Sequence, residues 1–137
     1  MNENTFAAPG ATLQRLRNLR SGLLRLHKVL LDLERAAYEQ AFGRVASGEL
    51  LQLVISHEQF AWLHAISELI VRIDEILDVD EPLTIDEAES VLAQARALLR
   101  PSETGSDFAQ RYHAALQRDP ATVLAHREVT LLLPEDA

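Results

Sequence analysis

One segment constrains the fold of this chain more than any other. It is residues 12–42, the longest run of regularly spaced leucines without a proline. Its apolar residues recur at intervals of three and four, the spacing of one helix face. At about 100° per residue they share one arc, and charged residues such as Arg17 and Asp32 lie opposite. We therefore predict an amphipathic helix over 12–42, capped by Thr12 and ended by Gly43. The apolar arc consists of Leu16, Leu19, Leu23, Leu26, Leu30, Leu31 and Ala37.

A second long helix is predicted over residues 47–78, with Ser47 as its cap. This segment is apolar on two sides, because Leu53, Phe60 and Val71 form a second stripe away from its main arc. A helix with two apolar sides is normally covered on both. We therefore expect it at the centre of the fold or at a contact with another chain. Its main arc consists of Leu51, Ile55, Trp62, Ile66, Leu69, Ile70, Ile73 and Ile76.

Two shorter helical segments follow, each with a recognisable start. Thr84 and Glu87 form the Thr-x-x-Glu pattern of a capping box. Asp107 opens the last segment, and Asp119 followed by Pro120 indicates a cap and a first-turn proline where the helix restarts. These signals predict helices over 84–100 and 107–133.

No segment shows the alternation of a strand, so we predict an all-α, four-helix-bundle-like fold. It comprises a long antiparallel hairpin of 12–42 and 47–78, completed by 84–100 and 107–133. The expected organisation is a flexible N-terminal arm at 1–11, a single helical domain at 12–133 and a tail at 134–137.

Composition and charge exclude several functions. The 137 residues include no cysteine, which excludes disulfides and thiolate metal sites. The net charge is −8 without aromatic residues interleaved among the bases, so we expect no nucleic-acid partner. No apolar run approaches the roughly 18 residues of a membrane span, and the N-terminus has no signal-peptide pattern. We therefore expect a cytoplasmic protein without a membrane partner.

The charge is divided between the two long segments. Residues 1–46 hold seven bases and four acids, whereas residues 47–100 hold three bases and eleven acids. An antiparallel hairpin turning near residue 45 brings these ends together. It would place Arg15 level with Glu75, and Arg17 level with Asp74.

Several polar residues stand where the helical pattern calls for apolar ones. His27 and Glu34 lie within the apolar arc of the first helix, two turns apart. His57, His64 and Glu68 follow one side of the second. The same hairpin register places His27 level with His64, and Glu34 level with His57.

This polar layer has two interpretations. In the first, Glu34 and His57 satisfy one another across the hairpin and fix its register. In the second, His27, Glu34, His57, His64 and Glu68 bind iron, manganese or zinc, which imidazole and carboxylate ligands suit. His64-x-x-x-Glu68 with His27 on the preceding helix resembles the first half of a hemerythrin site, which implies a hemerythrin-like or di-metal bundle. Segment 84–100 has no histidine to supply the second half.

The favoured hypothesis for function is a small helical interaction or regulatory module. No Gly-rich phosphate loop or nucleophile elbow occurs, so we expect neither an enzyme nor a cofactor. The two-sided second helix suggests that the chain forms a homodimer or docks a protein partner. Phe60 and Trp62 lie on opposite sides of that helix, and one of them should be exposed at the contact. The predicted interface is Phe60, Trp62, Leu53 and Val71.

Overall fold

The structure, a computed structural model, describes residues 7–78 and 82–134 and is all-α there, as predicted. The one β feature within these residues is an isolated bridge between Ala7 and Thr84. Both 47–78 and 107–133 are divided, so the described chain has more helices than the four expected. They are α1 (Gly10–Phe42), α2 (Ser47–Ser56), the 3₁₀ helix η2 (Glu58–Leu63), α3 (His64–Leu77), α4 (Ile85–Leu98), α5 (Asp107–Arg118) and α6 (Pro120–Thr130).

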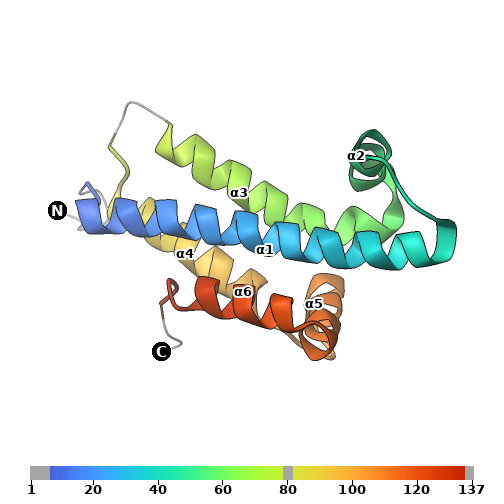
Figure 1. Cartoon of the computed structure of the whole chain (residues 1–137). Coiled ribbons are helices and arrows are strands. Elements are labelled where there is room, and N and C mark those ends of the chain that lie inside the picture. The colour runs from blue at the N-terminus through green and yellow to red at the C-terminus, as the bar shows by residue number, and fades with distance from the viewer. Residues whose placement is uncertain (1–6, 79–81, 135–137) are drawn as a thin grey trace.

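The central element is α1. It packs against α3 and η2 on one side and against α6 on the other, and it also contacts α4 (Figure 1). The central place expected for segment 47–78 is therefore taken by α1, and the alternative expectation for that segment, a contact with another chain, stays a prediction. The apolar arc predicted for residues 12–42 explains this arrangement, because several neighbouring helices are needed to bury it. Its fully buried members are Leu16, Leu19, Leu23, Leu26 and Leu30.

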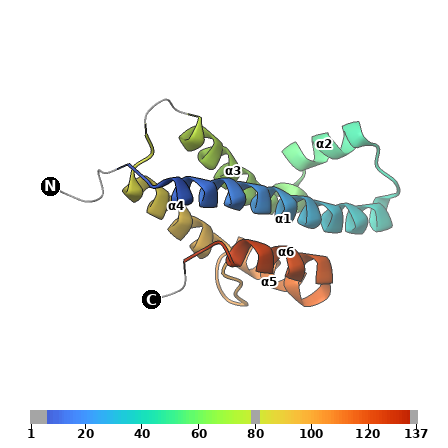
Figure 2. The same ribbon diagram turned by 60° about the vertical axis from the view of Figure 1, so that its left-hand side comes forward.

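The hairpin exists, but α1 pairs with α3 rather than with one continuous second helix. The two run antiparallel (Figures 1 and 2). Arg20 of α1 forms an ion pair with Asp74 of α3, and the His27 Nε2 atom lies 3.0 Å from the Ser67 hydroxyl. The predicted partner of Asp74 was Arg17, so the register is displaced by about one turn.

The predicted helix over 47–78 is interrupted after Ser56. His57 has an extended backbone, with φ −88° and ψ 134°, and η2 follows it. The α2 helix therefore turns away from the path of α3, as Figure 2 shows. The prediction assumed that the short link at 44–46 joins the two paired helices directly. In the structure all of residues 43–63 lie between α1 and α3, so this link does not set the register of α1 against α3. This accounts for the displaced pairing.

Three helix boundaries agree with their local signals. The Thr84 hydroxyl accepts a hydrogen bond from the Glu87 N–H at 3.1 Å, as a capping box requires. Gly43 ends α1 with φ +92°, a backbone angle that favours glycine. Asp119 is the N-cap of α6, and Pro120 is its first residue.

Other caps are not where the sequence suggested. The α1 helix begins at Gly10 after Pro9, so Thr12 lies inside it and the arm is shorter than expected. The N-cap of α2 is Ala46 rather than Ser47, whereas α5 begins at Asp107 as expected, with Ser106 as its N-cap. The remainder of the predicted arm, residues 1–6, and residues 135–137 of the tail lie outside the described residues.

Within the described ranges, no helix is both long and apolar enough to cross a lipid bilayer.

Part of the chain before α1 is held against the turn that precedes α4. The Ala8 N–H donates to the Leu83 carbonyl at 2.6 Å.

The α6 helix comes close to α1 at a glycine. A Cβ atom at Gly22 would meet the Val129 Cγ2 atom at 3.0 Å, tighter than ordinary van der Waals contact. Gly22 therefore allows α6 to cover α1.

A side chain at this crossing should destabilise the fold. We expect Gly22→Leu to lower the free energy of unfolding by about 1–3 kcal/mol, because it overpacks the contact between α1 and α6. Gly48→Leu is the matched control, since nothing lies within 4 Å of a Cβ there, and it should change stability by about 0.5 kcal/mol or less. Urea unfolding measures both. Equal effects would show that the contact is loose.

Candidate functional site

His27 and His64 lie near one another, as the hairpin predicted. His27 is half-buried on α1, and its Nε2 atom is within hydrogen-bond distance of the Ser67 hydroxyl. Burial lowers the pKa of His27, and the neighbouring His64 lowers it further. The neutral imidazole is thus the form that this environment favours.

His57 and His64 stabilise the interruption between α2 and α3. The His64 Nε2 atom donates to the Val54 carbonyl at 2.7 Å, and the His57 Nδ1 atom accepts from the Gln59 N–H at 3.1 Å. The last carbonyls of a helix have no internal partner, so His64 satisfies one at the end of α2. Both histidines therefore act as helix caps, a role that the sequence analysis did not consider.

Glu34 is buried, with 7% of its surface exposed, but its partner is not His57. Its Oε1 atom lies 3.6 Å from an Nη atom of Arg118, at the end of α5. The Glu34 main-chain carbonyl accepts a hydrogen bond from the Gln59 side chain at 3.1 Å. Glu34 thus joins α1 to α5 and η2. The predicted Glu34–His57 pair is replaced by contacts with Arg118 and Gln59.

The predicted metal ligands do not form one site. Across residues 7–78 and 82–134, no three His, Asp or Glu side chains are grouped so that they could hold a metal ion. His64 is used as a cap, Glu34 faces Arg118, and Glu68 is exposed. The resemblance to a hemerythrin site therefore does not extend to its geometry.

Phe60 and Trp62 are both buried within the chain, which corrects the prediction that one would be exposed. The Phe60 ring lies beside Tyr38 of α1, and the Trp62 ring lies 5.4 Å from Phe108 of α5. Their 3₁₀ segment contacts α1 and α5, as well as the neighbouring α2 and α3. The reason for placing them at a subunit contact therefore disappears.

The other two predicted interface residues differ. Leu53 is half-buried, whereas Val71 is 52% exposed on α3.

The main exposed apolar surface close to the turn is on α2. Leu51 and Ile55, one turn apart, are 58% and 60% exposed, and Phe42 at the end of α1 is 71% exposed. The Phe42 ring lies tilted against the Tyr38 ring, with centroids 4.8 Å apart, and the Tyr38 ring also contacts His57 directly after α2. We call Leu51 and Ile55 the α2 face.

The α2 helix is unusual because it contributes apolar residues without burying any completely. Leu50, Leu53 and Val54 are half-buried against the core, and no residue of α2 is buried. The apolar residues of α2 cover more than half of its circumference, so one side can pack while another faces outward. They are Leu50, Leu51, Leu53, Val54 and Ile55.

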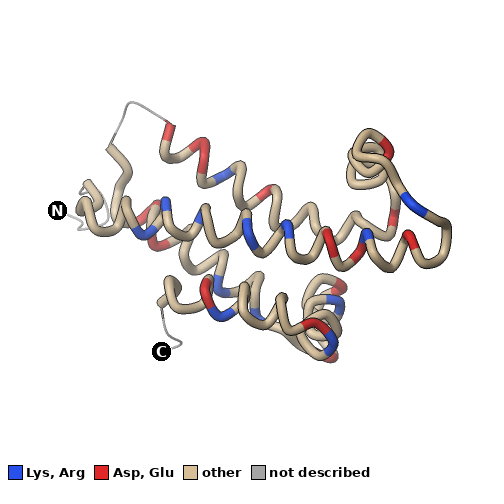
Figure 3. Tube along the Cα trace, in the orientation of Figure 1, with Lys and Arg blue, Asp and Glu red and all other residues tan. Residues whose placement is uncertain are grey.

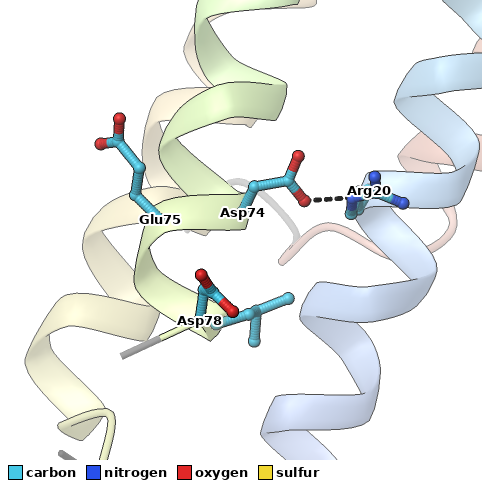
Figure 4. A pocket seen from close by; sticks show the side chains of 5 residues that line it. Arg20, Asp74, Glu75 and Asp78 are labelled. Atoms are coloured by element: carbon cyan, nitrogen blue, oxygen red, sulfur yellow. Dashed lines mark hydrogen bonds and ion pairs between the residues drawn. The ribbon is translucent and has the colours of Figure 1, made fainter. Parts of the chain in front are cut away.

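A shallow depression lies between α1 and the outer end of α3. Its volume is about 500 Å³, and Arg20, Asp74, Glu75 and Asp78 line it with Leu77. Figure 4 shows Arg20 joined to Asp74, whereas Glu75 points away from Arg20. Acidic residues cluster at this end of α3, opposite the bases of α1 (Figure 3). The uneven distribution of bases and acids along the chain is therefore consistent with the fold, because the Arg20–Asp74 ion pair joins the base-rich α1 helix to the acid-rich end of α3.

No protein-family model, curated protein or solved structure that was compared with this chain matches it. The functional argument therefore depends on its own side chains and surfaces. Of those described above, the α2 face remains without a structural role inside the chain.

The coupling between Glu34 and Arg118 can be measured with a double-mutant cycle. We expect Glu34→Ala and Arg118→Ala to show a coupling of about 0.5–1 kcal/mol in unfolding experiments, because they form an ion pair of which one member is exposed. The control cycle of Glu34→Ala with His57→Ala should show about 0.3 kcal/mol or less. A larger coupling in the control cycle would restore the pairing that the sequence suggested.

Stability should fall as the solution is acidified. Because the pKa of His27 is lowered in the folded chain, the unfolded chain binds protons first as the pH decreases through the ordinary histidine range. The free energy of unfolding should therefore decrease from pH 7.5 to pH 5. His27→Gln should make this decrease smaller, whereas Lys28→Gln at the exposed neighbouring position should leave it unchanged. Denaturant titrations across the range test this, and an unaltered slope in His27→Gln would contradict it.

Proposed function

We propose that this protein is a small helical interaction module that self-associates through the α2 face. The observation that carries the proposal is the exposure of Leu51 and Ile55 on a helix that buries no residue completely. Such a helix contributes little to the core of its own chain. Covering its outer side with protein would remove apolar surface from water, which is the main driving force of association.

Charge supports a second copy of the chain as the occupant. The net charge of −8 makes two copies repel each other over most approaches. Between Phe42 and His57 the charged residues are Arg44 and Glu49, which have opposite signs. A twofold axis through this neutral region would bring the same patch of each copy together without a concentration of like charge.

The size of the surface indicates a dissociable dimer. A ten-residue helix is about 15 Å long, and standard interfaces bury about 800 Å² per partner. The α2 face alone is smaller than this, so its flanking residues must join the contact. We therefore expect the dimer to separate on dilution.

This proposal includes no enzymatic activity, cofactor or metal. The cytoplasmic location and the lack of nucleic-acid and membrane partners stay predictions. Docking of a different protein on the same face is the alternative outcome of the test below.

Charged substitutions on the α2 face should produce monomers. We expect Leu51→Glu with Ile55→Glu to reduce the mass measured by light scattering from dimer to monomer, because each dimer would bury four carboxylates at one apolar contact. Both side chains are exposed, so helical circular dichroism should be retained. The matched control is Leu124→Glu on α6, which is 65% exposed and should leave the dimer intact.

Two outcomes would contradict self-association. The first is a wild-type chain that stays monomeric at the highest soluble concentration. The second is a dimer that persists in the doubly substituted variant with its helices intact.

A further inference from the structure

The two histidines at the interruption between α2 and α3 have opposite hydrogen-bonding roles. The Gln59 backbone N–H donates to the His57 Nδ1 atom at 3.1 Å. A backbone N–H can only donate, so this Nδ1 atom has a free electron pair and no proton. The His64 Nε2 atom faces the Val54 carbonyl at 2.7 Å, and a carbonyl can only accept, so this nitrogen carries a proton. Uptake of a second proton therefore affects the two rings differently.

Protonation breaks the hydrogen bond of His57 and keeps that of His64. An imidazolium ring has an N–H on both of its nitrogens. At His57 the new Nδ1–H would face the Gln59 N–H, and two donors form no hydrogen bond. At His64 the Nε2–H still donates to the Val54 carbonyl, now as a charge-assisted bond. Histidine side chains take up this proton between about pH 8 and pH 5, so His57 is the pH-sensitive contact of the pair.

The surroundings of His57 supply no carboxylate for a charged ring. Within residues 7–78 and 82–134, His57 forms no ion pair. Its ring makes a T-shaped contact with Tyr38 of α1, with centroids 5.5 Å apart. The Glu34 main chain binds Gln59, but the Glu34 carboxylate lies beside Arg118 of α5. A proton at His57 therefore removes one contact without creating an ion pair. Other titratable groups on the elements around this turn are Arg35 and Glu39 of α1, which pair with each other, Glu49 of α2, Glu58 of η2, and His64 and Glu68 of α3.

The position of α2 depends on this turn. Most of the contacts of α2 are with η2, and none of its residues is completely buried. Its ten residues are fewer than the roughly 12–15 that a helix needs to persist alone in water. The η2 segment has six residues, whereas 3₁₀ helices rarely exceed about three or four, so it depends on its cap. Loss of the His57 cap would therefore loosen both η2 and α2.

We propose that His57 is a pH-sensitive hinge, which holds α2 in place while its ring is neutral and releases α2 when the ring is protonated. The hinge itself needs no dimer. Its effect on assembly rests on the proposed function, because a loosened α2 no longer holds Leu51 and Ile55 on one face. Acidification should therefore separate the dimer. Net charge alone predicts the opposite, since protons on the five histidines reduce the charge of −8 and the repulsion between copies.

Amide hydrogen exchange of the full chain, followed by nuclear magnetic resonance at pH 7.5 and pH 5, tests the hinge. Protection factors remove the direct effect of pH on exchange. In the wild type we expect the protection of the Gln59 N–H and of the α2 amides to fall about fivefold at pH 5, the effect of losing one helix cap.

Two substitutions of His57 separate the cap from other effects of acid. His57→Asn places an oxygen where Nδ1 lies and takes up no proton, so its protection should be the same at both pH values. His57→Gln has its amide one bond further from the backbone and cannot replace Nδ1, so its protection should already be low at pH 7.5. The matched control is His113→Asn on α5, beside Glu103, which should respond to pH as the wild type does.

The hinge is overturned if wild-type protection is equal at both pH values, or if His57→Asn loses as much protection as the wild type. Wild-type protection in His57→Gln at pH 7.5 would overturn it as well. Light scattering at the same two pH values tests the dimer separately. A wild type that is monomeric at pH 7.5 contradicts the proposed function but not the hinge, whereas a dimer with pH-independent protection contradicts only the hinge. If both hold, acid separates the wild-type dimer and leaves the His57→Asn dimer intact. A wild-type dimer that persists at pH 5 with a loosened α2 overturns the control of assembly.

Discussion

Burial of the leucine arc of α1 is the interaction on which the rest of the structure depends. Its five fully buried leucines lie along about four turns of helix, and each contributes roughly 1.5–3 kcal/mol on leaving water. One neighbouring helix cannot cover a stripe of this width and length. Helices α3, α4 and α6, with η2, are therefore gathered around α1, and Gly22 lets α6 come close enough to complete the cover.

The features predictable from sequence are those encoded within a few residues. The leucine spacing predicted α1, the Thr84 capping box predicted the start of α4, and Asp119 with Pro120 predicted α6. Gly43 marked the end of α1 for the same kind of reason. In each case the deciding contacts join residues close in sequence, so a local pattern contains the information.

The candidate site was less predictable, because the interruption at His57 depends on contacts distant in sequence. No glycine or proline marks it, and the Gln59 side chain reaches Glu34 across the fold. One signal was present: segment 47–78 had two apolar stripes, and each of them includes residues of α2, η2 and α3, which do not form one continuous helix. Treating it as one helix aligned His57 and His64 into a ligand row and left either Phe60 or Trp62 apparently uncovered. The structure uses these histidines as caps and buries Trp62 against α5.

The incomplete burial of α2 separates two kinds of evolutionary constraint. Substitutions along the α1 arc alter the packing of most helices at once, so few are tolerated. The outward residues Leu51 and Ile55 contact little of their own chain, and changes there leave the core intact. Selection can therefore alter the recognition properties of this helix while the scaffold is conserved. A lineage of such proteins could diversify its partners through a few codons without passing through unstable intermediates.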